Sequence, residues 1–300
     1  MSDEKKVKVR KVMDIKSSYD EVIKPSELIQ ISGHQNLTLN ARRAITILWH
    51  NAHRQGISPG ADYTIELADL RTDNNRSLKP VEEAVLSLMQ TVLTVKMSGG
   101  RVRRVQFLGG NDMSDPERPQ GTLTYSFDKR LVEILQDSSI WGKIALPVLM
   151  AFSSKYAVSL YENCAQWLNL QHKMIQDLDI QELREMMGVE DGKYQSFGDL
   201  NIHVLKPAMM EINALAPFNV SVLPTKTGRR VTGVKIGWFA KSNEELSNAW
   251  QEAQRSKIGR KARLAGKVDR VMSPSKSAGA IAREDRKGRR MLLEDHSEKD

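Results

Sequence analysis

Residues 179–239 run DIQELREMMGVEDGKYQSFGDLNIHVLKPAMMEINALAPFNVSVLPTKTGRRVTGVKIGWF, and this stretch decides the fold. Apolar residues recur at helical spacing after Asp179, which suits an N-cap, and they stop at Gly188. A longer helix is predicted to start near Ser196, with one apolar face and an opposite face left free. Two runs of β-forming residues follow it. The order helix, turn, helix, hairpin predicts a winged helix-turn-helix.

The surfaces that this arrangement leaves free are polar and basic. The loop between the two strands carries Lys226, Arg229 and Arg230, and a cationic loop beside a free helix face suits phosphates and a groove together. The DNA contacts expected in this region are Lys193, Ser196, Asn201, His203, Lys206, Lys226, Arg229 and Arg230. Asn201 can pair with an adenine edge, and His203 can donate to a base or a phosphate. A solvated helix face on a protein-binding domain is the alternative.

A similar order of elements precedes this stretch. The predicted elements are a helix around 41–48, a strand at 62–67, a short helix at 67–70, a long helix at 81–92 and a hairpin of strands 101–108 and 121–127. The DNA contacts expected here are Arg76, Ser77, Lys79, Arg101 and Arg103. The first three lie where a helix start favours phosphate, although a plain N-cap by Ser77 explains them equally well. Arg101 and Arg103 share one face of a predicted strand, which must then be a solvent or ligand surface.

Two successive units of this kind predict an α+β protein with two tandem winged-helix domains. The predicted boundaries are a disordered N-terminal arm at 1–23, a first domain at 24–147, a second domain at 148–241 and a basic, largely disordered C-terminal tail at 242–300, in which 244–254 can add one helix. We expect the two domains to pack against each other.

The net charge of +8 is concentrated near the C-terminal end. Between Arg255 and Arg290, thirteen Lys or Arg stand against three acidic residues, a net charge of +10, so the rest of the chain carries about −2. Such a tail can hold nucleic acid through counterion release, but it cannot select a sequence. The high isoelectric point is therefore no argument for specific binding.

Other classes of protein find little support. No apolar run approaches the roughly 18 residues of a membrane span, and the charged N-terminus is not followed by an apolar segment, so we expect a cytoplasmic protein without membrane contacts. A single Cys164 excludes cysteine-based zinc sites, while His50 and His53 lack a third ligand and are predicted to be surface residues. No phosphate-binding loop and no catalytic trio is recognisable, so we expect no enzyme, no cofactor and no metal.

Four segments resemble the plasmid replication initiator (Rep) family, whose members bind repeated sites called iterons. The segments are FSSKYAVSLYE (152–162), LREMMGV (183–189), VLKPAMMEIN (204–213) and GRRVTGVKIGWF (228–239), in the order and spacing of the family. The resemblance covers 152–239 strongly and the first unit only by architecture. It implies a bacterial protein that binds origin repeats in double-stranded DNA as a monomer and opens adjacent AT-rich DNA. It also implies recruitment of host replication proteins, such as an initiator, helicase and chaperones, and autorepression as a dimer.

The chain departs from the family at one place. Members usually carry several basic residues at the exposed start of the second recognition helix, where this chain has Gly198, Asn201 and His203, so a base preference is not implied. A winged-helix transcriptional regulator without origin function has the same elements and is the alternative. A nicking initiator needs a tyrosine beside a metal-binding histidine cluster, and the sequence has no such cluster.

Overall fold

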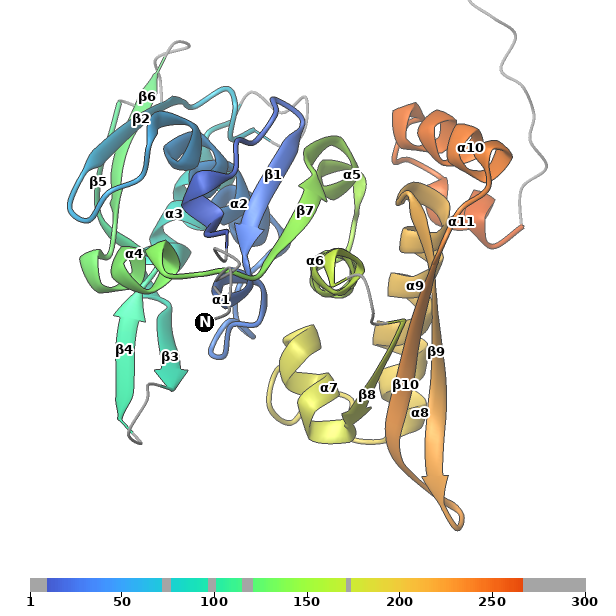
Figure 1. Ribbon diagram of the computed structural model, residues 1–300. Coiled ribbons are helices and arrows are strands. Elements are labelled where there is room, and N and C mark those ends of the chain that lie inside the picture. Colours follow the sequence, from blue (N-terminus) through green and yellow to red (C-terminus); the bar gives the residue numbers. More distant parts are fainter. Residues whose placement is uncertain (1–9, 72–76, 97–100, 115–120, 171–173, 267–300) are drawn as a thin grey trace, which may run out of the picture. The chain divides into compact units, whose positions relative to one another are not determined.

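The computed structural model describes residues 10–71, 77–96, 101–114, 121–170 and 174–266 (Figure 1). The chain divides into two compact units, Met1–Arg255 and Ser256–Asp300. The elements up to residue 151 are η1 (Val12–Asp14), β1 (Glu21–Pro25), α1 (Ser26–Ile29), α2 (Leu39–Gln55), β2 (Asp62–Glu66), α3 (Lys79–Gln90), β3 (Val92–Lys96), β4 (Val102–Gln106), β5 (Leu108–Met113), β6 (Thr122–Phe127), α4 (Lys129–Gln136), β7 (Trp141–Ala145) and α5 (Leu146–Ala151). The later elements of the first unit are α6 (Lys155–Asn169), β8 (Ile175–Asp179), α7 (Ile180–Met187), α8 (Phe197–Leu200), η3 (Asn201–Leu205), α9 (Lys206–Leu215), β9 (Phe218–Thr227), β10 (Arg230–Ala240) and α10 (Asn243–Gln254). The described part of the second unit contains α11 (Arg260–Leu264).

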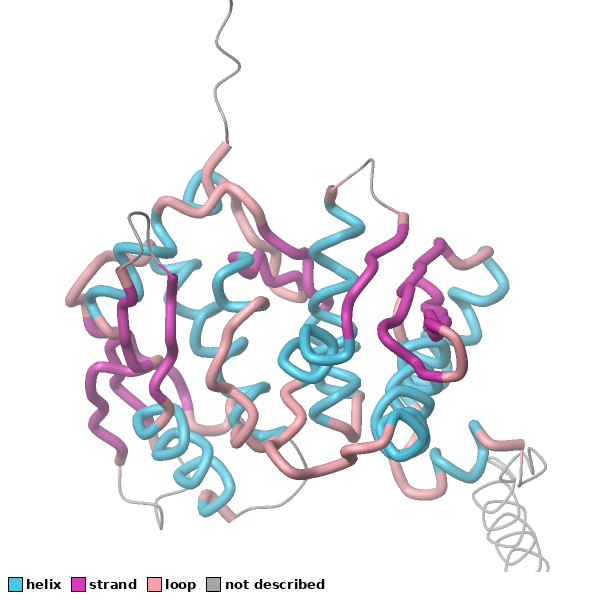
Figure 2. Tube along the Cα trace, turned by 90° about the horizontal axis from the view of Figure 1, so that it is seen from below, coloured by secondary structure: helices cyan, strands magenta, loops and turns pink. Residues whose placement is uncertain are grey.

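The strands form small antiparallel sheets rather than one continuous sheet. Within the described residues, β1 pairs with β7, β3 pairs with β4, and two three-stranded sheets have the orders β2-β6-β5 and β8-β10-β9. Figure 2 shows these strands, in magenta, as separate groups among the helices. Each sheet needs a helix to cover its apolar face, because so few strands bury little surface by themselves.

The second winged helix-turn-helix is confirmed in detail. Asp179 and Glu182 form a reciprocal capping box at the start of α7, and Gly188 ends the helix with a left-handed φ of 64°. The long helix predicted from Ser196 is continuous through α8, η3 and α9. Its middle part is π-helical, because Pro207 has no N–H to donate and its ring displaces the preceding turn.

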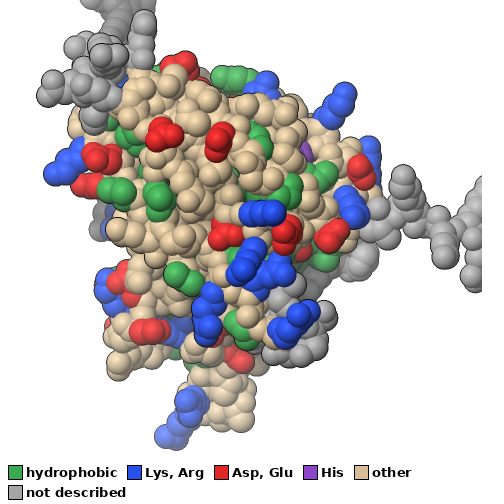
Figure 3. Space-filling view, turned by 90° about the vertical axis from the view of Figure 1, so that its left-hand side faces the viewer, with side chains coloured by type: hydrophobic (Ala, Val, Ile, Leu, Met, Phe, Trp, Pro, Cys, Tyr) green, Lys and Arg blue, Asp and Glu red, His purple; other side chains and the backbone are tan. Residues whose placement is uncertain are grey.

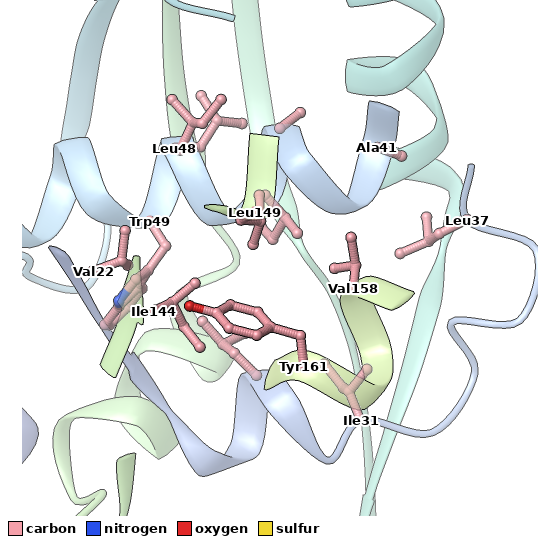
Figure 4. Packing of buried hydrophobic residues seen from close by; sticks show 14 of the residues in the cluster. Val22, Ile31, Leu37, Ala41, Leu48, Trp49, Ile144, Leu149, Val158 and Tyr161 are labelled. Carbon is pink, nitrogen blue, oxygen red and sulfur yellow. The ribbon is translucent and has the colours of Figure 1, made fainter. Parts of the chain in front are cut away.

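Helix α6 lies in the middle of the hydrophobic core (Figure 4). The fully buried ring of Tyr161 stacks on Phe218 of β9, with centroids 5.6 Å apart, and contacts Phe152, with centroids 5.2 Å apart. Its hydroxyl accepts a hydrogen bond of 3.0 Å from the Ala145 N–H at the end of β7. One side chain of α6 therefore contacts both the β1-β7 sheet and the second winged helix.

The prediction of a disordered arm does not hold for the described residues before 24. Residues 1–9 lie outside the described part of the chain, but 12–25 do not form a disordered arm. Val12 is fully buried in η1, and β1 pairs along its whole length with β7. The indole N–H of Trp49 donates to Ile23 O at 2.7 Å. The prediction was wrong here because these short apolar segments find their partners more than 100 residues away.

Three expectations for residues 24–147 were also wrong. Residues 67–70 form a turn instead of a short helix, although Leu67 and Leu70 are buried as core residues. The helix predicted to reach Val92 ends at Gln90, and Val92 begins β3. As a result β4 pairs with β3, and the expected hairpin of 101–108 with 121–127 does not form. A β-branched valine fits the period of either element, so the pattern alone did not separate them.

His50 and His53 of α2 were predicted to be surface residues, and this prediction was wrong. His50 is buried and its Nε2 lies 3.2 Å from Tyr19 O, while the His53 ring stacks on Trp49 with centroids 5.6 Å apart. Burial lowers the pKa of both rings. Among the described residues no group of His, Cys, Asp or Glu could hold a metal ion. In the same part of the chain, no helix has the length and apolar character needed to cross a membrane.

Candidate nucleic-acid interface

The wing is the tip of the β9–β10 hairpin, residues 223–232. Strand β8 pairs only with residues 233–237 of β10, so the hairpin continues beyond the sheet (Figure 1). Gly228 has a φ of 61° and stands first in the two-residue turn, as in II′ hairpin turns. Lys226, Arg229 and Arg230 are all exposed, and none of their side chains has a hydrogen bond or ion pair within the described residues. The wing therefore presents cations that have no partner within the described residues, on a two-stranded ribbon.

The recognition helix, residues 197–215, presents its exposed face beside this sheet. Its core face contains the fully buried residues Val204, Ala208 and Ile212, as predicted. The exposed residues are Gly198, Asp199, Ile202, His203, Lys206, Met210 and Asn213. Asn201 is half-buried at the edge of this face, and its carbonyl oxygen accepts the Lys206 N–H. The structure thus places His203 and Lys206 on one face and Asn201 at its margin.

The start of the recognition helix is held by its own cap. Ser196 Oγ accepts the Asp199 N–H at 3.0 Å and donates to Asp199 Oδ2 at 2.7 Å. The His203 ring stacks on Tyr194, with centroids 5.2 Å apart and ring planes at 22°. Tyr194 is the one described non-glycine residue with positive φ. The turn before the helix therefore fixes the orientation of the His203 imidazole.

Arg184 on α7 fixes that turn. Its guanidinium donates to Tyr194 O at 2.8 Å, to Lys193 O at 2.7 Å and to Glu190 O at 3.4 Å. The planar fork of an arginine suits several acceptors at once. No pattern in the sequence pointed to Arg184, because its role depends on backbone carbonyls that converge only after the turn forms.

Lys193, one of the predicted DNA contacts, is already paired. Its Nζ lies 2.6 Å from Glu190 Oε2, and this hydrogen bond raises the pKa of Lys193 and lowers that of Glu190. Lys155 at the start of α6 binds the other Glu190 oxygen at 3.0 Å and donates to Gln35 O at 2.7 Å. Lys193 can thus contact DNA only by sharing or exchanging its carboxylate partner.

The first winged-helix domain, residues 24–147, offers a less defined surface for DNA. Arg76 lies outside the described residues. Ser77 and Lys79 are exposed at the start of α3, where Ser77 Oγ accepts the Lys79 N–H at 3.3 Å. Pro80 occupies the first turn of this helix. The N-cap residue is Leu78, without a side-chain cap hydrogen bond, so Ser77 is not the predicted N-cap, although its hydroxyl accepts one N–H at the helix start.

Arg101 and Arg103, which were predicted to share one free strand face at 101–108, differ in exposure. Arg101 is exposed, but Arg103 is half-buried and lies 3.5 Å from Glu133 of α4. Arg103 shares its strand face with the buried Val105, so that face is not solvent surface throughout. Arg104 points to the opposite, exposed side, which the alternation of the strand could have shown.

Further basic residues lie close to this strand. The Arg103 guanidinium donates to Arg130 O at 3.5 Å, which places β4 beside the start of α4, where Lys129 and Arg130 are exposed. Figure 3 shows the face on the left-hand side of Figure 1, and Lys and Arg side chains gather in its lower half among several Asp and Glu. Lys129 and Arg130 were not among the predicted contacts, because they belong to an ordinary amphipathic helix in the sequence.

Comparison with known proteins agrees with this geometry. Residues 21–165 match the family described as initiator replication protein, WH1, and residues 179–238 match initiator Rep protein, WH2. Fold and surfaces together define an α+β protein with two tandem winged-helix domains, as predicted. The chain belongs to the initiator Rep protein family.

One solved structure shows the same fold, and a second is similar only in part. The Pi initiator protein, crystallised in complex with iteron DNA, is similar with a TM-score of 0.56 over 76% of this chain and 100% of that chain, at 17% identity. Selenomethionine derivatives of domain 2 and domain 3 of RctB are similar with a TM-score of 0.40 over 70% of this chain and 82% of that chain, at 8% identity. No curated protein matches the chain significantly in sequence.

Proposed function

We propose that this protein initiates plasmid replication by binding direct repeats, the iterons, at an origin in double-stranded DNA. It promotes opening of adjacent AT-rich DNA and recruits host replication proteins such as an initiator, a helicase and chaperones. As a dimer it represses its own gene. Membership in the initiator Rep family and the likeness to the Pi initiator, which was crystallised with iteron DNA, support this proposal.

The observation that carries the proposal is the pairing of a cationic wing with an exposed helix face. Lys226, Arg229 and Arg230 have no partners among the described residues, and His203 and Lys206 stand on the adjacent helix. Phosphate contacts by a wing set the register of a protein on a duplex, and side chains from a helix in the major groove select the sequence. A domain that bound only protein would have no need for unpaired cations on a projecting ribbon.

The two domains have different proposed roles. We assign the main DNA-binding function to residues 148–241 and assign dimerisation with additional DNA contacts to residues 24–147. Two recognition helices in successive major grooves would cover about two helical turns. The basic tail, within 242–300, adds attraction to DNA that does not depend on sequence.

Opening DNA requires several bound copies. Bending a short site costs on the order of 1 to 6 kcal/mol, and the cost must be met by binding free energy. An array of direct repeats places many copies side by side, so their contacts add. The proposed work is accordingly binding and strand distortion in the bacterial cytoplasm, without bond making and without a cofactor.

Footprinting tests the proposal directly. The full chain, separated into monomer and dimer, is applied to the DNA that flanks its own coding sequence at stated salt concentrations. Regular protected repeats of about two turns, with neighbouring AT-rich DNA reactive to single-strand probes, are expected. Protection of a single inverted repeat at the promoter and nowhere else would instead identify a winged-helix transcriptional regulator.

A further inference from the structure

Ile202 is an apolar residue on the exposed face of the recognition helix. Its side chain is 57% exposed, whereas Val204 and Leu205, only two and three residues further on, are fully buried. Lys206 and Met210 follow Ile202 at intervals of four residues and are also exposed. Ile202 is therefore part of the stripe that faces away from the core, within the N-terminal half of the helix.

The local backbone holds Ile202 in this position. It lies in the π-helical segment, in which the Lys206 N–H bonds to Asn201 O, and the buried residues Val204 and Leu205 follow one residue later. A β-branched side chain in a helix has one strongly preferred χ1 rotamer, so little side-chain entropy is lost when its surface is covered. Ile202 thus presents a stiff apolar surface on the exposed part of the helix that also carries His203 and Lys206.

We infer that Ile202 recognises thymine by packing against its C5 methyl group in the major groove. The inference rests on the proposed function, because it assumes that this helix enters the groove. Thymine alone among the four bases presents a methyl group there. His203 and Lys206 can supply hydrogen bonds and charge, but neither offers an apolar surface that matches a methyl group.

An apolar residue can also act on DNA as a wedge that separates base steps from the minor groove. A wedge kinks the duplex and does not depend on the C5 methyl group, which lies in the major groove. Replacing thymine by uracil removes that methyl group and leaves every hydrogen-bonding atom of the base in place. The thymine-to-uracil exchange therefore tests the methyl contact and not the wedge.

The experiment uses the full chain and a library of randomised DNA duplexes. The duplex enriched by selection is resynthesised with uracil at one thymine position at a time, and affinity is measured for each version. We expect at least one exchange to weaken binding about fourfold, the value for one buried carbon group. Ile202→Ala should weaken binding to the thymine duplex. At the position where the exchange to uracil weakens binding of the unchanged protein, it should have no further effect on the variant, because the side-chain truncation and the loss of the methyl group remove the same contact.

Leu246→Ala is the matched control, since Leu246 is an exposed aliphatic residue on α10. It should retain both the affinity and the full uracil penalty. If Ile202→Ala keeps the same penalty at every position, another residue recognises the methyl groups, and the inference fails while sequence-specific binding stands. If selection enriches no sequence, the proposed function itself fails and the inference fails with it.

Discussion

Lys24 Nζ lies 2.6 Å from Glu162 Oε1, and both side chains are almost completely buried. The lysine is on β1 and the glutamate on α6, so the pair joins the first sheet to the helix that also packs against the second winged helix. Thr46 of α2 completes the group, with its hydroxyl 3.0 Å from Lys24 Nζ and 3.2 Å from Glu162 Oε1. Burial lowers the pKa of Lys24, and the carboxylate of Glu162 opposes that shift.

Breaking this pair should destabilise the protein strongly. Glu162→Gln leaves the Lys24 ammonium group buried without a counter-charge, and we expect a loss of about 3 to 5 kcal/mol in the free energy of unfolding. Urea denaturation measures it. Lys235 pairs with Asp177 at 2.7 Å on the surface, and the matched Lys235→Met should cost less than about 1 kcal/mol. Equal losses for the two variants would contradict the role of burial.

His34 should make stability depend on pH. Its buried ring donates from Nδ1 to Ile31 O, and burial, together with the guanidinium of Arg42, lowers its pKa to about 3. Lys24 and Lys155 also disfavour the charged ring. The unfolded chain takes up the proton near its ordinary pKa of about 6.5. The stabilising effect is therefore complete above about pH 6.5 and is lost as pH falls toward 3.

Urea unfolding at a series of pH values tests this expectation. From the His34 ring we expect the free energy of unfolding to fall by about 1.4 kcal/mol for each pH unit below about 6.5. His34→Asn keeps a side-chain N–H donor but does not titrate, so its stability should change less steeply with acid. The same slope in both proteins would show that other groups cause the acid sensitivity.

Arg184 should control the order of the turn before the recognition helix. Arg184→Lys keeps the charge but cannot reach the carbonyl oxygens of Glu190, Lys193 and Tyr194 together, and we expect a loss of about 2 kcal/mol. Hydrogen exchange should become faster at the amides of residues 189–196. Specific DNA affinity should fall more than affinity for random DNA. Unchanged exchange in the turn would refute the assignment.

The second winged helix could be predicted because its local signals agree. Asp179 with Glu182, Gly188 and Gly228 each favour one backbone geometry, and they stand at the ends of the elements they define. In the first winged-helix domain, the pairing of β4 depends on Val92, which suits helix and strand equally well. The partner of a strand is set by contacts distant in sequence, so periodicity could not supply it.

The candidate site was predictable only in part. Charged residues at a hairpin tip, such as Arg229 and Arg230, are exposed in almost any packing, so their exposure on the wing could be predicted from the sequence. On the recognition helix the π-helical segment shifts the face, which leaves Asn201 half-buried and Ile202 exposed. An exposed isoleucine follows no sequence rule, because apolar residues are expected in the core.

Asn201 should affect sequence preference rather than general affinity. Its side-chain amide makes no hydrogen bond within the described residues, so Asn201→Ala leaves the helix intact. We expect a loss of about 1 to 3 kcal/mol on the selected duplex and almost none on random DNA. Competition binding between the two DNAs measures the difference. Asn248→Ala on exposed α10 is the control, and an equal loss on both DNAs would exclude base recognition by Asn201.

The wing should supply affinity that does not depend on sequence. Replacing Arg229 and Arg230 by alanine removes two cations that have no partner in the described part of the chain, without disturbing the turn, whose geometry depends on Gly228. Binding should weaken on all sequences alike. The slope of log affinity against log salt should decrease by about 2, since each phosphate contact contributes about 0.9. Lys235→Ala, which removes a paired cation from the same strand, should leave the slope unchanged. An unaltered slope in the double variant would mean that the wing does not contact phosphates.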